Sequence, residues 1–108
     1  SGKIEIADIT MPSICDSIVT TQPGEITFPI NKKLLSGSAV ITDRDALQAV
    51  ATAFKHLKII IEPGGAAALA AVLTGQYPAG AKTVVAVASG GNIDSPMFQR
   101  ALDEGPIF

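Results

Sequence analysis

The apolar segment 83–88, followed directly by Ser89-Gly90-Gly91-Asn92, constrains the fold of this chain more than any other part of the sequence. A short apolar run is typical of a strand that is buried on both faces. Open α/β sheets bind ligands at the carboxyl ends of such strands. Two glycines at that end leave bare backbone that another group can approach, and a hydroxyl and a carboxamide flank them. We therefore predict a small-molecule site in this loop.

Helical patterns surround this predicted strand. Thr42-Asp43-Arg44-Asp45 forms a capping-box variant, and apolar residues recur after it at helical spacing, which predicts a helix over 43–57. Pro63 suits the first position of another helix, which continues over 66–73. Further helices are predicted over 12–19, 26–35 and 94–104, short strands over 4–7 and 39–41, and either a strand or a buried helix end over 58–61. This mixture of elements predicts an α/β fold.

The composition argues against several classes of protein. The 108 residues form one domain or part of one, and an apolar content of 47% argues against disorder. The net charge is −2 with scattered basic residues, which argues against a nucleic-acid surface. No run approaches the roughly 18 apolar residues of a membrane span. The single cysteine, Cys15, cannot form an internal disulfide, and no basic-then-apolar signal segment opens the chain, so we expect a cytoplasmic protein.

Each titratable residue that could belong to a functional site also has a purely structural interpretation. His56, late in a helix, suits the helix dipole, and Cys15 lacks the partners of a metal site. Asp16, in an apolar helix, is expected to need a cap or a salt bridge. Glu62 ends an apolar run before Pro63 and must stay solvated or be paired. The residues alone are also equally consistent with a tight turn at the glycine loop, because the dinucleotide-binding and P-loop patterns are absent.

Three sequence blocks, in this order, carry a resemblance to a known family. The first is PSICDS (12–17) followed by PGEITFPI (23–30), the second is IEPGGAAALAA (61–71), and the third is ASGGN (88–92). Together they resemble the carboxyl-terminal third of the threonine/serine dehydratase family, which includes serine racemases and hydroxyaspartate dehydratases. These are pyridoxal-phosphate enzymes of the tryptophan-synthase β-subunit fold. The resemblance implies that residues 1–108 are a single unit, a carboxyl-terminal fragment of the cofactor-binding large domain, with few, mainly parallel strands and packed helices.

The resemblance implies roles for the residues of the third block. Ser89 is expected to hydrogen-bond the pyridine nitrogen of the cofactor. Gly90 and Gly91 would let the loop pass close to the ring, and Asn92 would fix the loop by side-chain hydrogen bonds. A neutral hydroxyl does not force the nitrogen to stay protonated, so the ring is a weaker electron sink. That property suits β-elimination, in which the negative charge leaves with the hydroxyl group of the substrate.

The first two blocks add three expected cofactor-binding residues. Glu62 resembles the family glutamate that precedes a proline near the cofactor pocket. Asp16 resembles the aspartate of the family motif Ala-Asp-Gly, which here reads Cys15-Asp16-Ser17. The serine in place of glycine, Ser17, bears on how closely the backbone approaches the ring and on substrate choice.

The resemblance also implies what this chain lacks. In the family, the Schiff-base lysine, the glycine-rich phosphate loop and the divalent-cation ligands precede the matching region. No lysine here lies in a matching context; the six are Lys3, Lys32, Lys33, Lys55, Lys58 and Lys82. Covalent catalysis needs that amine, so we expect no catalytic residue and no metal site in the chain, and no activity from the chain alone.

These observations predict the carboxyl-terminal segment of a pyridoxal-phosphate-dependent β-eliminating ammonia-lyase. Its parent would dehydrate threonine, serine or a hydroxylated aspartate and release ammonia and a keto acid. An amino-acid racemase is the alternative enzyme, and a non-catalytic small-molecule-binding or regulatory α/β domain is the alternative from another class. We expect the parent to be a homo-oligomer that acts on a small amino acid, without a nucleic-acid or membrane partner.

Overall fold

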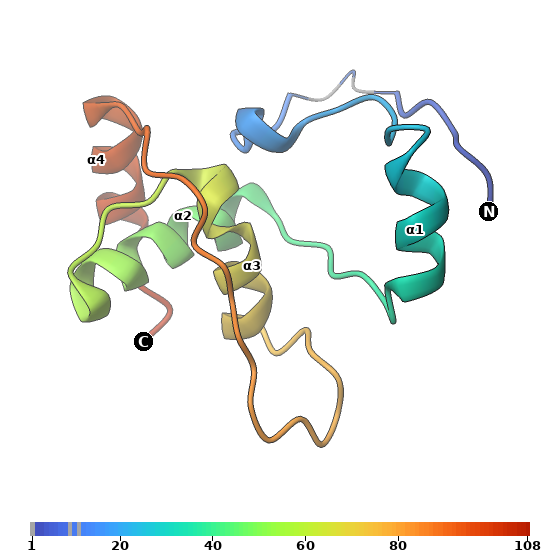
Figure 1. The fold of residues 1–108 in the computed structure, drawn as a ribbon. Coiled ribbons are helices and arrows are strands. Elements are labelled where there is room, and N and C mark those ends of the chain that lie inside the picture. Colours follow the sequence, from blue (N-terminus) through green and yellow to red (C-terminus); the bar gives the residue numbers. More distant parts are fainter. Residues whose placement is uncertain (1, 9, 11) are drawn as a thin grey trace.

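The computed structural model describes residues 2–8, 10 and 12–108 as short helices joined by long helix-free segments (Figure 1). In chain order the elements are the 3₁₀ helix η1 (Asp16–Ile18), α1 (Thr27–Leu34), α2 (Asp43–Thr52), the π-helix η2 (Ala53–Leu57), α3 (Pro63–Leu73) and α4 (Ser95–Glu104). None of these helices has the length and apolar character that crossing a membrane requires.

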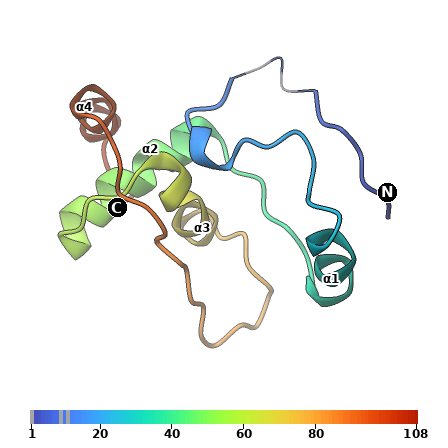
Figure 2. The same cartoon turned by 45° about the horizontal axis from the view of Figure 1, so that its top comes forward.

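The core lies where α2 contacts α3 on one side and α4 on the other. Figures 1 and 2 show α2 between these two helices, with α1 standing apart from them. The Phe54 and Phe98 rings meet edge to face, 5.2 Å between centroids, and join η2 to α4. Small side chains dominate the buried cluster and let the helices approach closely; its members are Leu47, Ala49, Val50, Ala53, Ile61, Ala66, Ala70 and Ala101. This packing fixes the start of α3 against α2.

The helix predicted over 43–57 is confirmed as α2 followed by η2. The Thr42 hydroxyl accepts the Asp45 N–H at 3.1 Å, and the Asp45 carboxylate accepts the Thr42 N–H at 2.8 Å, so the predicted capping box is present. The helix ends at Leu57, and the next residue, Lys58, has a left-handed φ of 59°. The helices predicted over 26–35, 66–73 and 94–104 are confirmed as α1, α3 and α4, whereas the one predicted over 12–19 is limited to η1.

The capping box makes the stability of α2 sensitive to acid. Donation from the Thr42 main-chain N–H, and then from its hydroxyl, holds the pKa of Asp45 below its ordinary value of 3.8. Because folding lowers this pKa, the stabilisation is complete above the unfolded value and is lost as the pH falls through the folded value. Below about pH 4 we therefore expect the unfolding free energy to fall less steeply in Asp45→Asn than in the unaltered chain. Urea titrations at several pH values measure this difference, and parallel curves for the two proteins would contradict it.

The α/β fold with few, mainly parallel strands is not confirmed within the described residues, which form helices but no strand. None of the segments predicted as strands, or as possible strands, forms a strand in the described part of the chain; these are 4–7, 39–41, 58–61 and 83–88. The segment 83–88 runs from the turn beyond α3 up to α4 (Figure 1), and Val85 and Val87 are 84% and 67% exposed. A strand pairs its backbone groups with a neighbouring strand, and no described segment of this chain takes that place. The apolar run is therefore exposed rather than buried on both faces.

The exposed segment 83–88 predicts self-association. Contiguous exposed apolar surface is uncommon on monomers, and unpaired backbone can pair with another copy of the chain. We expect sedimentation of the 108-residue chain to show larger species whose fraction rises with concentration. The Val85→Lys variant, altered at an exposed position, should associate less without losing helical circular dichroism. A strictly monomeric chain at high concentration would contradict this expectation.

Candidate functional site

Three segments that are far apart in the sequence meet at the amino-terminal end of α3. From one side, η1 contacts α3, and the Ser17 hydroxyl lies where a side chain on Gly64 would begin. From the other side, the loop 89–92 crosses the same end, with the Gly90 backbone packed on Gly65. These contacts bring parts of the three sequence blocks that carry the family resemblance together at one place, whereas residues 27–30 of the first block lie in α1, apart from it.

Glu62 joins the second block to the third through two hydrogen bonds. Its main-chain N–H donates to the Gly90 carbonyl at 2.9 Å, and its carboxylate oxygen Oε2 accepts the Asn92 N–H at 3.1 Å. Glu62 is also the residue that precedes the first turn of α3, yet its side chain makes no capping hydrogen bond to that helix. The half-buried carboxylate is therefore paired with the loop, which answers the question that the sequence left open.

Glycines allow this crossing. A methyl group on Gly65 would lie 2.5 Å from the Gly90 carbonyl oxygen and 2.7 Å from its nitrogen. A methyl group on Gly90 would lie 2.7 Å from Glu62 Oε1, and one on Gly91 would lie 2.8 Å from the Ile60 carbonyl oxygen. Contacts within the chain thus explain why residues 90 and 91 of the loop are glycines. The expectation that Gly90 and Gly91 also admit the cofactor ring remains a prediction.

Ser89 and Asn92 stand at the two ends of the loop. The Ser89 side chain is exposed, and its hydroxyl has no hydrogen-bond partner among the described residues. The side-chain hydrogen bonds expected from Asn92 are not found in the described part of the chain; its main-chain N–H holds the loop instead. Beyond it, the Asp94 carboxylate accepts the Met97 N–H at 2.7 Å and caps α4. The loop is therefore fixed from the Gly90 side onward, with a free hydroxyl at its start.

Asp16 does not have the cap or salt bridge that the sequence predicts. It is the first residue of η1, it is exposed, and its carboxylate has no ion-pair or hydrogen-bond partner within residues 2–8, 10 and 12–108. Its neighbour Cys15 is 6% exposed, and burial raises the pKa of its thiol. Asp16 is thus solvated, which is the other way for a carboxylate to avoid the cost of burial.

The sequence interpretation missed the contact that anchors the first block. Ser13 donates its hydroxyl to Asp43 Oδ1 at 2.9 Å, and the Ile14 N–H donates to Asp43 Oδ2 at 3.4 Å. The Cys15 N–H in turn donates to the Ser13 oxygen at 3.1 Å. Asp43 begins α2, so these hydrogen bonds place η1 beside the helix core. Because the partners are about 30 residues apart, no local sequence signal reports them.

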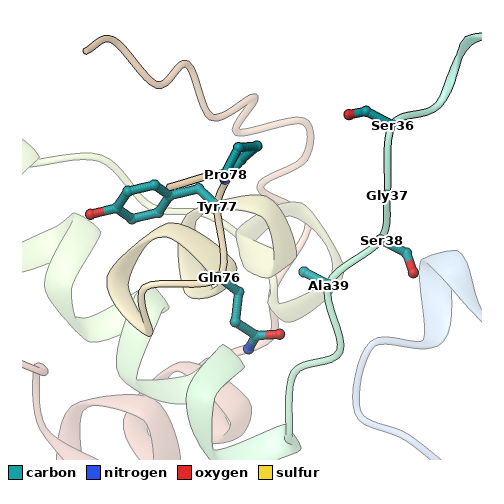
Figure 3. A pocket seen from close by; sticks show the side chains of 7 residues that line it. All are labelled: Ser36, Gly37, Ser38, Ala39, Gln76, Tyr77 and Pro78. Atoms are coloured by element: carbon teal, nitrogen blue, oxygen red, sulfur yellow. The ribbon is translucent and has the colours of Figure 1, made fainter. Parts of the chain in front are cut away.

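A cavity of about 500 Å³ lies away from this site, between a helix-free segment and the turn after α3 (Figure 3). It is lined by Ser36, Gly37, Ser38, Ala39, Gln76, Tyr77 and Pro78. The carboxamide of Gln76 is already occupied, because its oxygen accepts the Val40 N–H at 3.0 Å. None of the residues that the sequence assigns to the functional site lines this cavity, and it presents no charged side chain. The start of α3 therefore remains the candidate functional site.

The contact between Ser17 and Gly64 predicts a compensating pair of variants. Gly64→Ala should destabilise the chain by at most about 1 kcal/mol, because the new methyl group overlaps the Ser17 oxygen and the exposed Ser17 side chain must rotate away. Ser17→Ala removes that oxygen and keeps Cβ, which lies at an ordinary 3.5 Å from the added methyl group. Urea unfolding of the double variant should recover most of the loss. Losses that simply add would show that the two residues do not touch.

Comparison with known proteins identifies the class of this chain. Residues 2–90 match the family model described as pyridoxal-phosphate dependent enzyme, and the chain belongs to this family. It is similar to L-threonine ammonia-lyase of Thermotoga maritima, at 32% identity over 96 residues that cover 89% of this chain and 24% of that protein. It is also similar to serine racemase of Dictyostelium discoideum, at 34% identity over 106 residues that cover 95% of this chain and 32% of that protein.

A solved structure supports the same assignment. The crystal structure of a threonine deaminase from T.th. matches with a TM-score of 0.76 at 33% identity, covering 86% of this chain and 31% of that chain. The predicted resemblance to the threonine/serine dehydratases and the dependence of the family on pyridoxal phosphate are confirmed, and the match supports the tryptophan-synthase β-like fold. The chain spans between 24% and 32% of the length of these relatives.

Proposed function

We propose that this chain is a segment of a pyridoxal-phosphate-dependent ammonia-lyase that eliminates water from a small hydroxy amino acid, and that it supplies the side of the pocket facing the pyridine nitrogen. The observation that carries this proposal is the meeting of η1, the Glu62–Gly65 turn and the loop 89–92 at the start of α3. Family membership gives that convergence its chemical meaning.

The residues present fit the cofactor. Ser89 has an exposed hydroxyl that no described residue engages, directly before a loop that Glu62 holds in place. A hydroxyl can donate to an unprotonated ring nitrogen and can accept from a protonated one. When bound, the cofactor supplies an electron sink for the substrate carbon that loses its proton.

The Ser89 hydroxyl orients the ring without imposing a charge on it. A carboxylate at this position would favour the protonated nitrogen, because an opposite charge nearby stabilises the charged form. A neutral hydroxyl lacks that effect, so it leaves the electron sink moderate. This suits a reaction in which the substrate's own hydroxyl group departs with the electron pair. Asp16 and Ser17, on the opposite side of the α3 start, are proposed to contact the cofactor or the substrate.

A racemase is the second candidate, because the serine racemase of Dictyostelium discoideum is among the relatives. Both activities begin with removal of the same substrate proton, and the residues of this chain serve both equally. We further propose that the enzyme is a cytoplasmic homo-oligomer; the single unpaired cysteine, Cys15, supports a reducing compartment.

The experiment uses the longest polypeptide in which this chain naturally occurs. With pyridoxal phosphate added, we expect ammonia and a keto acid from threonine, serine or a hydroxylated aspartate, and chiral analysis of remaining serine separates the racemase. The 108-residue chain alone serves as a control and should release no keto acid. A polypeptide that begins near residue 1, binds a small molecule and carries no Schiff-base lysine would contradict the proposal in favour of a non-catalytic binding domain.

A further inference from the structure

The position of Ser89 depends on what holds the residue after it. From Lys82 to Ser89, the structure records no hydrogen bond with any described residue. The next backbone hydrogen bond before this segment joins the Ala81 N–H to the Pro78 carbonyl at 3.2 Å. The first one after it is accepted by the Gly90 carbonyl. Ser89 is therefore anchored from one side only, by the loop that follows it.

Glu62 contributes three contacts to that anchor. Its N–H donates to the Gly90 carbonyl at 2.9 Å, and its Oε2 accepts the Asn92 N–H at 3.1 Å. Its carboxylate also lies directly against the Cα of Gly90, since an added methyl group there would be 2.7 Å from Oε1. The two hydrogen bonds bracket Gly91, whose own Cα faces the Ile60 carbonyl. The loop is thus held at both ends of its two-glycine segment by one side chain and its backbone.

We propose that Glu62 is a positioning residue that fixes the Ser89 hydroxyl through the backbone of Gly90 and Asn92, rather than a residue that binds the cofactor itself. The carboxylate is turned to the loop, where Oε2 accepts the Asn92 N–H. The part of this inference that concerns the cofactor rests on the proposed function. The geometric part is a property of the chain alone.

The geometric part is tested by amide hydrogen exchange in the 108-residue chain. Glu62→Ala should speed exchange of the Asn92 amide about tenfold or more, the factor expected for loss of one hydrogen bond to a charged acceptor. The amide of residue 62 should keep more protection, because its bond to the Gly90 carbonyl uses no side chain. Glu62→Gln, which retains an acceptor oxygen, should restore much of the protection, and Glu25→Ala, at an exposed carboxylate in a turn, is the control. Unchanged Asn92 exchange, or equal acceleration at core amides such as Val50, would overturn the inference.

The proposed effect of Glu62 on the cofactor is tested in the longest natural polypeptide that contains this chain. The dissociation constant of pyridoxal phosphate is measured for three variants, which are Glu62→Ala, Ser89→Ala and the double variant. If Glu62 acts through Ser89, the double variant should bind no more weakly than Ser89→Ala, although Glu62→Ala alone weakens binding several-fold. Purely additive losses, or no loss in Glu62→Ala, would overturn the positioning role. Failure of Ser89→Ala to alter binding or the cofactor spectrum would instead refute the proposed function, which keeps the two failures distinct.

Discussion

Gly65→Ala is expected to destabilise the chain by about 1–3 kcal/mol and to separate the loop 89–92 from α3. The added methyl group would lie 2.5 Å from the Gly90 carbonyl oxygen and 2.7 Å from the Gly90 nitrogen. Both atoms belong to the backbone, so no side chain can rotate out of the way, and the loop itself must move. Because the Glu62 N–H donates to that same carbonyl, its amide should exchange faster as well.

A matched glycine elsewhere in the chain provides the control. A methyl group on Gly37 would meet nothing within 4 Å, and this residue has no positive φ. Gly37→Ala should therefore leave the urea midpoint unchanged or raise it slightly, since it restricts only the unfolded chain. Equal midpoints for Gly65→Ala and Gly37→Ala would show that the loop does not cross α3 in solution.

Ser89→Ala should slow elimination by the longest natural polypeptide about ten- to hundred-fold. If the hydroxyl meets the pyridine nitrogen, its removal leaves a buried polar atom unpaired, at a cost of about 1–3 kcal/mol. Each 1.4 kcal/mol corresponds to about tenfold in rate. Steady-state turnover of threonine, measured together with the cofactor absorbance, gives the effect.

Ser89→Asp separates this role from a purely structural one. A carboxylate would hold the nitrogen protonated and strengthen the electron sink. The cofactor absorbance should therefore change, and elimination should be slower than in the unaltered protein. If Ser89 only shapes the turn, Ser89→Ala and Ser89→Asp should both lower the stability of the protein and leave the cofactor spectrum unchanged. Unchanged spectra and turnover in both variants would remove Ser89 from the site.

The helices were predictable because their signals are local. The Thr42–Asp45 capping box and Pro63 at a helix start each act within a few residues, and each lies where the sequence places it. Strand formation at 83–88 depends on partners that no local pattern supplies. The pattern of that segment was therefore an unreliable guide to its burial in this chain.

The site was predictable in its parts but not in its contacts. The family resemblance selected Ser17, Glu62 and the loop 89–92, and the structure brings them to one end of α3. It did not reveal that the glycines serve contacts within the chain, or that Glu62 holds the loop. The link from Ser13 to Asp43 was equally hidden, because both residues have ordinary local interpretations and meet only through the tertiary fold.

A crystal structure of the longest natural polypeptide with pyridoxal phosphate bound tests the central claim most directly. We expect Ser89 Oγ to lie about 2.7–3.2 Å from the pyridine nitrogen, with the Asn92 N–H still donating to Glu62. A ring nitrogen that faces another side chain, or a Ser89 hydroxyl that points to solvent, would contradict the claim.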